Sequence, residues 1–178
     1  MIKPNIDAVK NNLSEYQYPV DVIIEVTRHC NLRCIMCPYP KLVRPKGNMS
    51  FQTFRRIVDE TARENPEARL WLAIMGEPLM LGKSLIRFIR YAKESGIREV
   101  NVNTNAVLMD SEISEGLIES GTDKVLVSID ASSKGTYDAI RLGGDFDAVR
   151  KNINDLIHLK TQMNSPTPEV IVQFIVMD

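Results

Sequence analysis

The sequence lacks both a long apolar run and an excess of either charge. Its 178 residues include 22 Lys and Arg against 23 Asp and Glu, so the formal net charge is −1. A near-neutral chain has no general attraction for nucleic acid or for an anionic membrane surface. The longest apolar runs, such as residues 70–75, are far too short to span a bilayer. We therefore expect neither nucleic acid nor membrane as a partner.

A secretion signal is also missing, and cysteine is scarce. Residues 1–5 show no basic region followed by an apolar one, so we expect a cytoplasmic protein. The chain has only three cysteines, which stand close together as Cys30, Cys34 and Cys37. An odd and tightly grouped set does not suit a disulfide framework, and a reducing compartment disfavours disulfides. The thiols suit a metal ion or an iron–sulfur cluster.

Short apolar segments alternate along the chain with segments of helical periodicity. Five segments have the apolar, β-branched character of strands in a parallel sheet: residues 20–26, 70–75, 99–104, 124–130 and 170–177. Four segments between them predict helices: 51–58 after Ser50 as the N-cap, 83–95, 110–120 and 146–157. This order predicts an α/β fold, a partial (β/α) TIM-like barrel with about five parallel strands and four helices in an open sheet.

The expected domains are an N-terminal lead-in, residues 1–19, and a single core, residues 20–178. No helix follows the last apolar strand, and an uncovered edge strand is a liability that natural proteins manage. A complete eight-unit barrel needs about 250 residues. We therefore expect a piece of a longer enzyme, incomplete at its C-terminus. The alternative is a naturally short chain that covers its last strand by oligomerising.

Polar residues stand at the carboxyl ends of four expected strands, which is where ligands bind in parallel α/β folds. In chain order these are the cysteine segment TRHCNLRCIMCP, Gly76-Glu77-Pro78, Asn103-Thr104-Asn105 and Ser128-Ile129-Asp130. Four strand ends that meet at one rim predict one site. Because side chains alternate along a strand, we expect Ser128 and Asp130 to point into the barrel mouth. The same alternation predicts that Asn103 and Asn105 line the site.

The C-x3-C-x2-C spacing indicates what kind of metal centre the thiols hold. A [4Fe–4S] cluster is usually held by four thiolates, so three cysteines on one loop leave one iron open to an exogenous ligand. That arrangement suits chemistry at the cluster better than electron storage. The alternative is a zinc site with His29 or a carboxylate as the fourth ligand. His29 is adjacent to Cys30, which makes chelation of one ion by both residues awkward.

These motifs together resemble the radical S-adenosylmethionine (radical SAM) superfamily, whose signature is C-x3-C-x2-C after the first strand. The resemblance includes EVTRHCNLRCIMCP, then MGEP, NTNA and VSID after or within the next three strands. It is greatest to members with a C-terminal, cysteine-rich (SPASM-type) extension that binds auxiliary clusters, and this sequence has no further cysteine for such clusters. Those members modify peptides or dehydrogenate small molecules.

The resemblance implies which residues bind the two cofactors. Cys30, Cys34 and Cys37 would bind three irons of a [4Fe–4S] cluster, and S-adenosylmethionine would chelate the fourth. Met36 would lie against adenine, Gly76 near the methionine amino group, and Arg141 at a carboxylate or ribose. Together with strand alternation, the resemblance gives the cofactor-binding set Met36, Gly76, Glu77, Pro78, Asn103, Asn105, Ser128, Asp130 and Arg141.

The activity implied by the resemblance is reductive cleavage of S-adenosylmethionine to methionine and a 5′-deoxyadenosyl radical. That radical would abstract hydrogen from a peptide or a small metabolite. The electron would come from a flavodoxin or ferredoxin with its reductase. Two alternatives remain: a non-catalytic metal or iron–sulfur module, and a catalytically incomplete fragment. Gly76-Glu77-Pro78, Ser128 and Asp130 favour the enzyme, because a structural metal site does not need them.

Three charged residues near the cysteines have expected roles outside the cofactor set. Glu25 falls on the inward register of the first strand, and a buried carboxylate needs a partner. Arg44 and Lys46 lie in the proline-rich loop that follows the cysteines. We expect that loop to be solvated, with contact to an anionic substrate or a reductant as the alternative.

Overall fold

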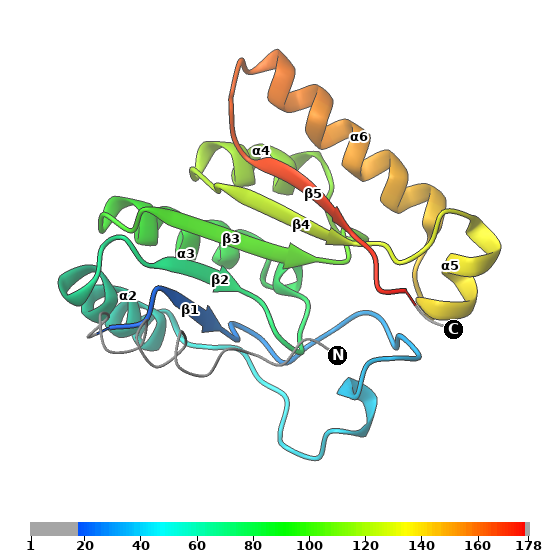
Figure 1. The fold of residues 1–178 in the computed structure, drawn as a ribbon, viewed down its shortest axis with the longest axis horizontal. Helices are drawn as coiled ribbons and strands as arrows, with labels where there is room; N and C mark the ends of the chain where they lie inside the picture. The colour runs from blue at the N-terminus through cyan, green and yellow to red at the C-terminus, as the bar shows by residue number, and fades with distance from the viewer. Residues whose placement is uncertain (1–17, 177–178) are drawn as a thin grey trace, which may run out of the picture.

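The computed structural model describes residues 18–176 and forms one five-stranded parallel sheet (Figure 1). In chain order, which is also the sheet order, the strands are β1 (Asp21–Ile24), β2 (Arg69–Leu72), β3 (Glu99–Thr104), β4 (Lys124–Ser128) and β5 (Glu169–Gln173). The helices are α2 (Phe51–Glu64), α3 (Lys83–Glu94), α4 (Ser111–Glu119), α5 (Lys134–Ile140) and α6 (Phe146–Gln162), with short 3-10 helices η1 (Tyr39–Lys41) and η2 (Pro78–Leu81). Residues 1–17 of the expected lead-in, and Met177 of the expected last strand, lie outside the described residues. Within residues 18–176, no helix has the length and apolar character needed to cross a membrane.

The predicted α/β fold with five parallel strands is confirmed, but the helix count of four is wrong. The additional helix is α5, which has only seven residues and buries only Tyr137, so it has no apolar stripe that the sequence could show. Four strands end earlier than predicted, β1 at Ile24, β2 at Leu72, β4 at Ser128 and β5 at Gln173. Shortly after the ends of β2 and β4, Ile74 has φ 108° and Asp130 has φ 55°. Positive φ values are incompatible with extended backbone, so the chain turns there.

The core lies between the sheet and the helices that cover one of its faces. Alternate strand residues are fully buried there, namely Leu70, Leu72, Val100, Val102, Val125 and Val127. Helices α2 and α3 pack through Phe54 and Phe88, whose rings stack with centroids 4.4 Å apart. Ser50 is the predicted N-cap, because its hydroxyl accepts from the Thr53 N–H. Helix α6 packs on the core through Phe146, Val149 and Leu156, whereas Ile157, the last residue of the predicted helix, is 44% exposed.

The other face of the sheet carries a row of alternating charges at the amino ends of the strands. Asp21, Arg69 and Glu99 are neighbours in the strand register. Arg69 donates to both carboxylate oxygens of Asp21, at 2.8 and 2.6 Å, and its hydrogen bonds hold the pKa of that carboxyl below its usual value. Lys124 donates to Glu99 at 2.9 Å and lies opposite Glu169 in the register. This charge row fixes the amino ends of the strands, and the carboxyl ends carry the candidate site.

Candidate active site

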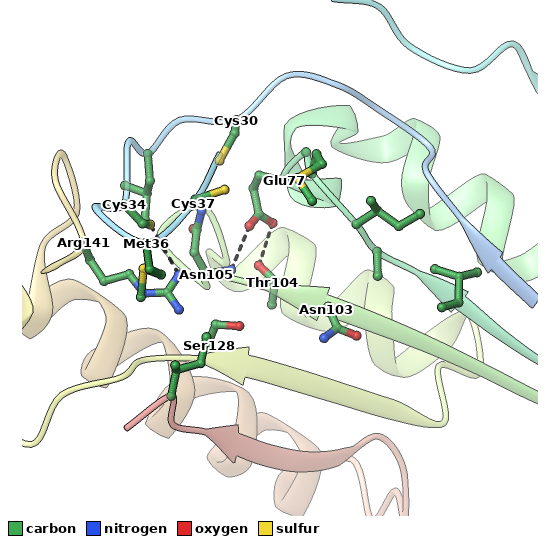
Figure 2. Close-up of a pocket in the computed structure, with 17 residues that line it drawn as sticks. Cys30, Cys34, Met36, Cys37, Glu77, Asn103, Thr104, Asn105, Ser128 and Arg141 are labelled. Carbon is green, nitrogen blue, oxygen red and sulfur yellow. Dashed lines mark hydrogen bonds between the residues drawn. The ribbon is translucent and has the colours of Figure 1, made fainter. Parts of the chain in front are cut away.

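The cysteine loop and the carboxyl ends of the strands enclose a cavity of about 470 Å³ (Figure 2). Most of the residues predicted to bind the cofactors line this cavity: Cys30, Cys34, Met36, Cys37, Gly76, Glu77, Asn103, Asn105, Ser128 and Arg141. Pro78 and Asp130 do not line it. Pro78 is buried as the first residue of η2. The structure therefore brings the thiols and the polar strand ends to one place.

Backbone hydrogen bonds hold the cysteine loop against the end of α5 and the residues just after it. The Arg33 N–H donates to the Leu142 carbonyl at 2.9 Å, and the Ile35 N–H donates to the Ile140 carbonyl at 3.0 Å. The two donors flank Cys34 on either side. The thiol of Cys34 is therefore placed by a pairing between segments about 107 residues apart in the chain.

The thiols are partly buried, and burial raises the pKa of both Cys30 and Cys34. Arg141 opposes the rise in the pKa of Cys34 through the positive charge of its guanidinium and through the hydrogen bond that it donates to the sulfur at 3.6 Å. Among residues 18–176, no three His, Cys, Asp or Glu side chains are gathered closely enough to hold a single metal ion.

Tyr39 supports two of the cysteines from outside the cavity. Its hydroxyl accepts from the Cys30 N–H at 3.1 Å, and its own N–H donates to the Cys37 sulfur at 3.4 Å. The side chain is 6% exposed. Nothing in the sequence distinguishes Tyr39 from an ordinary loop residue, and its contact with Cys30 depends on how the proline-rich segment folds back.

Gly76 lies where two loops touch through their backbones. A Cβ atom at this position would be 2.0 Å from the carbonyl oxygen of Thr27, which is far inside van der Waals contact. The next residue, Glu77, donates its N–H to the His29 carbonyl at 2.8 Å. The resemblance relates Gly76 to the approach of a cofactor. The structure adds a requirement of the protein itself, because the cysteine loop packs directly on this glycine.

Glu77 is 3% exposed, and its carboxylate joins the end of β2 to the end of β3. It accepts from the Thr104 hydroxyl at 2.6 Å and the Asn105 N–H at 2.7 Å (Figure 2). It also accepts from the Leu79 N–H at 3.1 Å. Burial raises the pKa of the Glu77 carboxyl, and these hydrogen bonds oppose the rise. The carboxylate is thus occupied by the protein's own donors. Thr104 was not predicted as a site residue, since alternation placed it on the opposite face from Asn103.

Asn103 and Ser128 present polar atoms to the cavity from neighbouring strands. The Asn103 amide nitrogen donates to the Gln173 side chain at 3.3 Å. Within the described residues, its buried amide oxygen has no hydrogen-bond partner, which leaves an acceptor available to a ligand. Asn105 is less available, because its amide nitrogen donates to Asn31 at 2.9 Å.

Strand alternation predicted that Asp130 points into the barrel mouth, but in the structure it does not line the cavity. The strand ends at Ser128, and the positive φ of Asp130 breaks the alternation. The Asp130 side chain is 1% exposed and pairs with Arg141. Its second oxygen accepts from the Ile175 N–H at 2.8 Å. Asp130 therefore holds Arg141, and Arg141 lines the cavity beside Cys34.

The expected partner for Glu25 is found in the proline-rich loop. Arg44 donates to its carboxylate, at 2.7 Å for one of the oxygens, and the Glu25 side chain is 14% exposed. The pair fastens the loop to the end of β1. The position of Glu25 in the strand pattern predicted that it is paired, but nothing in the sequence identified Arg44 as its partner.

Comparison with known proteins gives relatives in sequence and in fold. The chain is 30% identical over 140 residues to a GTP 3′,8-cyclase of Desulforamulus reducens, covering 77% of this chain and 42% of the cyclase. It is 32% identical over 136 residues to an Fe-coproporphyrin III synthase of Methanosarcina barkeri, covering 75% of this chain and 33% of the synthase. It thus spans only about two fifths or less of these relatives. The fold is similar to that of native anSMEcpe with bound AdoMet, with a TM-score of 0.73 and 22% identity over 89% of this chain and 44% of that one.

The family model of the Radical SAM superfamily matches residues 24–164. This range contains all three cysteines and every other residue predicted to bind a cofactor. Because the match covers well over half of the chain, the protein belongs to the radical SAM superfamily.

Proposed function

We propose that this chain is the core of an enzyme that binds a [4Fe–4S] cluster through Cys30, Cys34 and Cys37 and binds S-adenosylmethionine in the adjoining cavity. When bound, the two groups supply one-electron cleavage of the sulfonium and abstraction of hydrogen from a substrate. The observation that carries the proposal is a single cavity lined by three thiols, a guanidinium and the polar ends of β3 and β4.

The residues present fit an open cluster. Three thiols from one loop leave room for a non-protein ligand on the cavity side, where all three cysteines face the same space. Tyr39 and Arg141 each contact a cysteine sulfur and thereby fix its position. Hydrogen bonds to ligand sulfurs are also one of the means by which a protein tunes cluster potential.

The cavity also fits a zwitterionic nucleoside such as S-adenosylmethionine. Arg141 supplies a positive charge for a carboxylate, and the amide oxygen of Asn103 supplies an acceptor without a partner among the described residues. Apolar side chains, including Leu32, Met36 and Ile175, form the remaining wall and exclude water from the bound cofactor.

We propose a peptide or a small metabolite as the substrate. The names of the two relatives refer to chemically different molecules, GTP and Fe-coproporphyrin III. Neither name therefore indicates the substrate of this chain. The cavity is within the size range of small-molecule sites, which is about 300–1,000 Å³. Electron supply by a flavodoxin or ferredoxin is part of the same proposal.

Anaerobic reconstitution with iron and sulfide tests the proposal. We expect a reduced [4Fe–4S] signal in electron paramagnetic resonance, a change in that signal when S-adenosylmethionine is added, and formation of 5′-deoxyadenosine with dithionite. Cys34→Ala should lose the signal. Ser128→Ala is the matched control, because Ser128 lines the cavity without holding iron, and it should keep the signal while responding more weakly to S-adenosylmethionine.

Two results contradict the proposal. One is binding of a single zinc ion in place of iron and sulfide. The other is a cluster whose signal does not respond to S-adenosylmethionine, which identifies a non-catalytic iron–sulfur module.

A further inference from the structure

The charge of this nearly neutral chain is strongly uneven around the cysteines. From Val26 to Val58 there is no acidic residue, although the chain has 23 Asp and Glu. The same stretch contains seven of the 22 Lys and Arg: Arg28, Arg33, Lys41, Arg44, Lys46, Arg55 and Arg56. A one-signed segment in a balanced protein creates a local positive field that net charge conceals.

The most exposed part of this stretch is residues 41–46, here called the basic tip. The loop that carries it extends away from the sheet (Figure 1, cyan). All six residues of the basic tip are exposed, and Val43 is 99% exposed. Lys41 and Lys46 form no ion pair with any described residue, whereas Arg44 pairs with Glu25. The basic tip thus combines an apolar side chain with uncompensated positive charge.

The basic tip is held in place from beneath. Arg28 is 5% exposed, and its guanidinium donates to the carbonyls of Arg44 and Pro45, the latter at 2.8 Å. The Arg28 N–H donates to the Gly47 carbonyl at 2.8 Å. A buried arginine that satisfies loop carbonyls fixes the loop's shape before any partner arrives, which reduces the ordering cost of binding.

The basic tip lies close to the cysteines but outside the cavity. Tyr39, whose N–H contacts the Cys37 sulfur at 3.4 Å, begins η1, and Lys41 ends it. None of residues 38–46 lines the cavity. A small anionic substrate of the cavity therefore does not meet the basic tip, whereas a macromolecule arriving from solvent does.

We propose that the basic tip docks an acidic electron-carrier protein that delivers one electron to the cluster site. This inference rests on the proposed function. An exposed apolar residue beside positive charge is typical of a protein interface, and charge complementarity orients and accelerates docking. A nucleic acid fits less well, because Tyr39 is buried and the basic tip offers no aromatic ring for bases to stack on. In the transfer, the carrier is oxidised by one electron and the cluster is reduced by one.

Binding of purified flavodoxin to the full chain, measured by surface plasmon resonance at low and high salt, tests the proposal. Lys41→Glu/Lys46→Glu should weaken binding at least about tenfold at low salt and reduce its salt dependence. Val43→Asp is a second tip variant and should also weaken binding. It should not disturb folding, because a side chain so exposed contributes little to stability. The matched control is Lys83→Glu/Arg90→Glu, the same charge change on exposed residues of α3, which should stay within about twofold of wild type.

The proposal is overturned if wild type does not bind flavodoxin, if the tip variants bind as well as wild type, or if the basic tip binds an RNA oligonucleotide more tightly than flavodoxin. Assays with dithionite distinguish failure of the docking proposal from failure of the proposed function, because a small reductant needs no docking surface. The tip variants should form 5′-deoxyadenosine with dithionite at the wild-type rate. If no protein forms it, the proposed function fails, and the binding data alone decide on the docking surface.

Discussion

Two buried carboxylates organise the candidate site at the scale of single residues. Glu77 accepts three hydrogen bonds from protein donors, and Asp130 pairs with Arg141 while accepting from the Ile175 N–H. Each carboxylate joins segments that are distant in the chain, and both are satisfied within the protein. Their effect on chemistry is therefore indirect, through the placement of β3 and of Arg141.

Asp130→Ala is expected to destabilise the protein by about 3 kcal/mol, because it leaves the buried Arg141 without its counter-charge. Urea denaturation measures the change. Asp138→Ala is the control, since Asp138 is 49% exposed and lies 4.0 Å from Lys134, a geometry worth at most about 0.5 kcal/mol. Equal effects of the two substitutions would show that the Asp130–Arg141 pair contributes nothing to stability.

Glu77 should make stability depend on pH. Its raised pKa means that the native carboxyl holds a proton more tightly than the unfolded one, whose ordinary pKa is 4.5. The resulting stabilisation is complete below that value and is lost as pH rises through the native pKa. We therefore expect the stability of wild type relative to Glu77→Gln to fall as pH rises above 4.5. Urea midpoints over a pH series measure this, and a relative stability that rises with pH would show that the three hydrogen bonds outweigh burial.

At the scale of helices and strands, the sequence predicted the fold well where the apolar pattern was long. All five strands and four of the helices were located in this way. Helix α5 was not, because only Tyr137 of its seven residues is buried. The predicted inward direction of Asp130 was wrong for a related reason, since a strand pattern cannot show where positive φ interrupts it.

The sequence predicted most of the residues that form the candidate site, but not the hydrogen bonds that connect them. Strand ends gave most of the cavity residues, because parallel strands deliver their carboxyl ends to one edge. The contacts of Glu77 with Thr104 and of Tyr39 with Cys30 depend on register and loop path, which no local pattern encodes. Pro78, predicted by the resemblance, and Asp130, predicted by strand alternation and the resemblance, do not line the cavity.

The contact between the end of β2 and the cysteine loop predicts a large effect of Gly76→Ala. The added methyl group would press on the Thr27 carbonyl, and we expect a loss of about 3 kcal/mol or more together with reduced iron content after reconstitution. Thermal unfolding and iron analysis measure both. Gly135→Ala is the control, because nothing lies within 4 Å of a Cβ there in α5, and it should raise stability slightly. A Gly76 variant with wild-type stability and iron content would mean that the two loops separate freely.

At the scale of the whole molecule, the sheet has an apolar outer edge. β5 is the last strand of the described sheet, and Val172, Phe174 and Val176 in or after it are 44%, 55% and 90% exposed. Unpaired strand edges with apolar side chains are sites of association between chains.

We expect the 178-residue chain to self-associate through this edge, with a sedimentation coefficient that rises with concentration. Val172→Lys/Phe174→Lys should keep it monomeric, because charge on an edge strand opposes pairing. Met163→Lys, at an exposed apolar residue next to α6, is the control and should leave association unchanged. Association that survives the edge variant would place the contact elsewhere.

The charge row at the amino ends of the strands also disfavours some other orders of the strands. Exchanging β2 with β3 would set Asp21 beside Glu99 and Arg69 beside Lys124, so that both new pairs of neighbours would repel each other. In the native arrangement the signs alternate across the sheet. A sheet with β2 and β3 exchanged is therefore destabilised by repulsion between like charges. A designed protein with that strand order would need different charged residues at these positions.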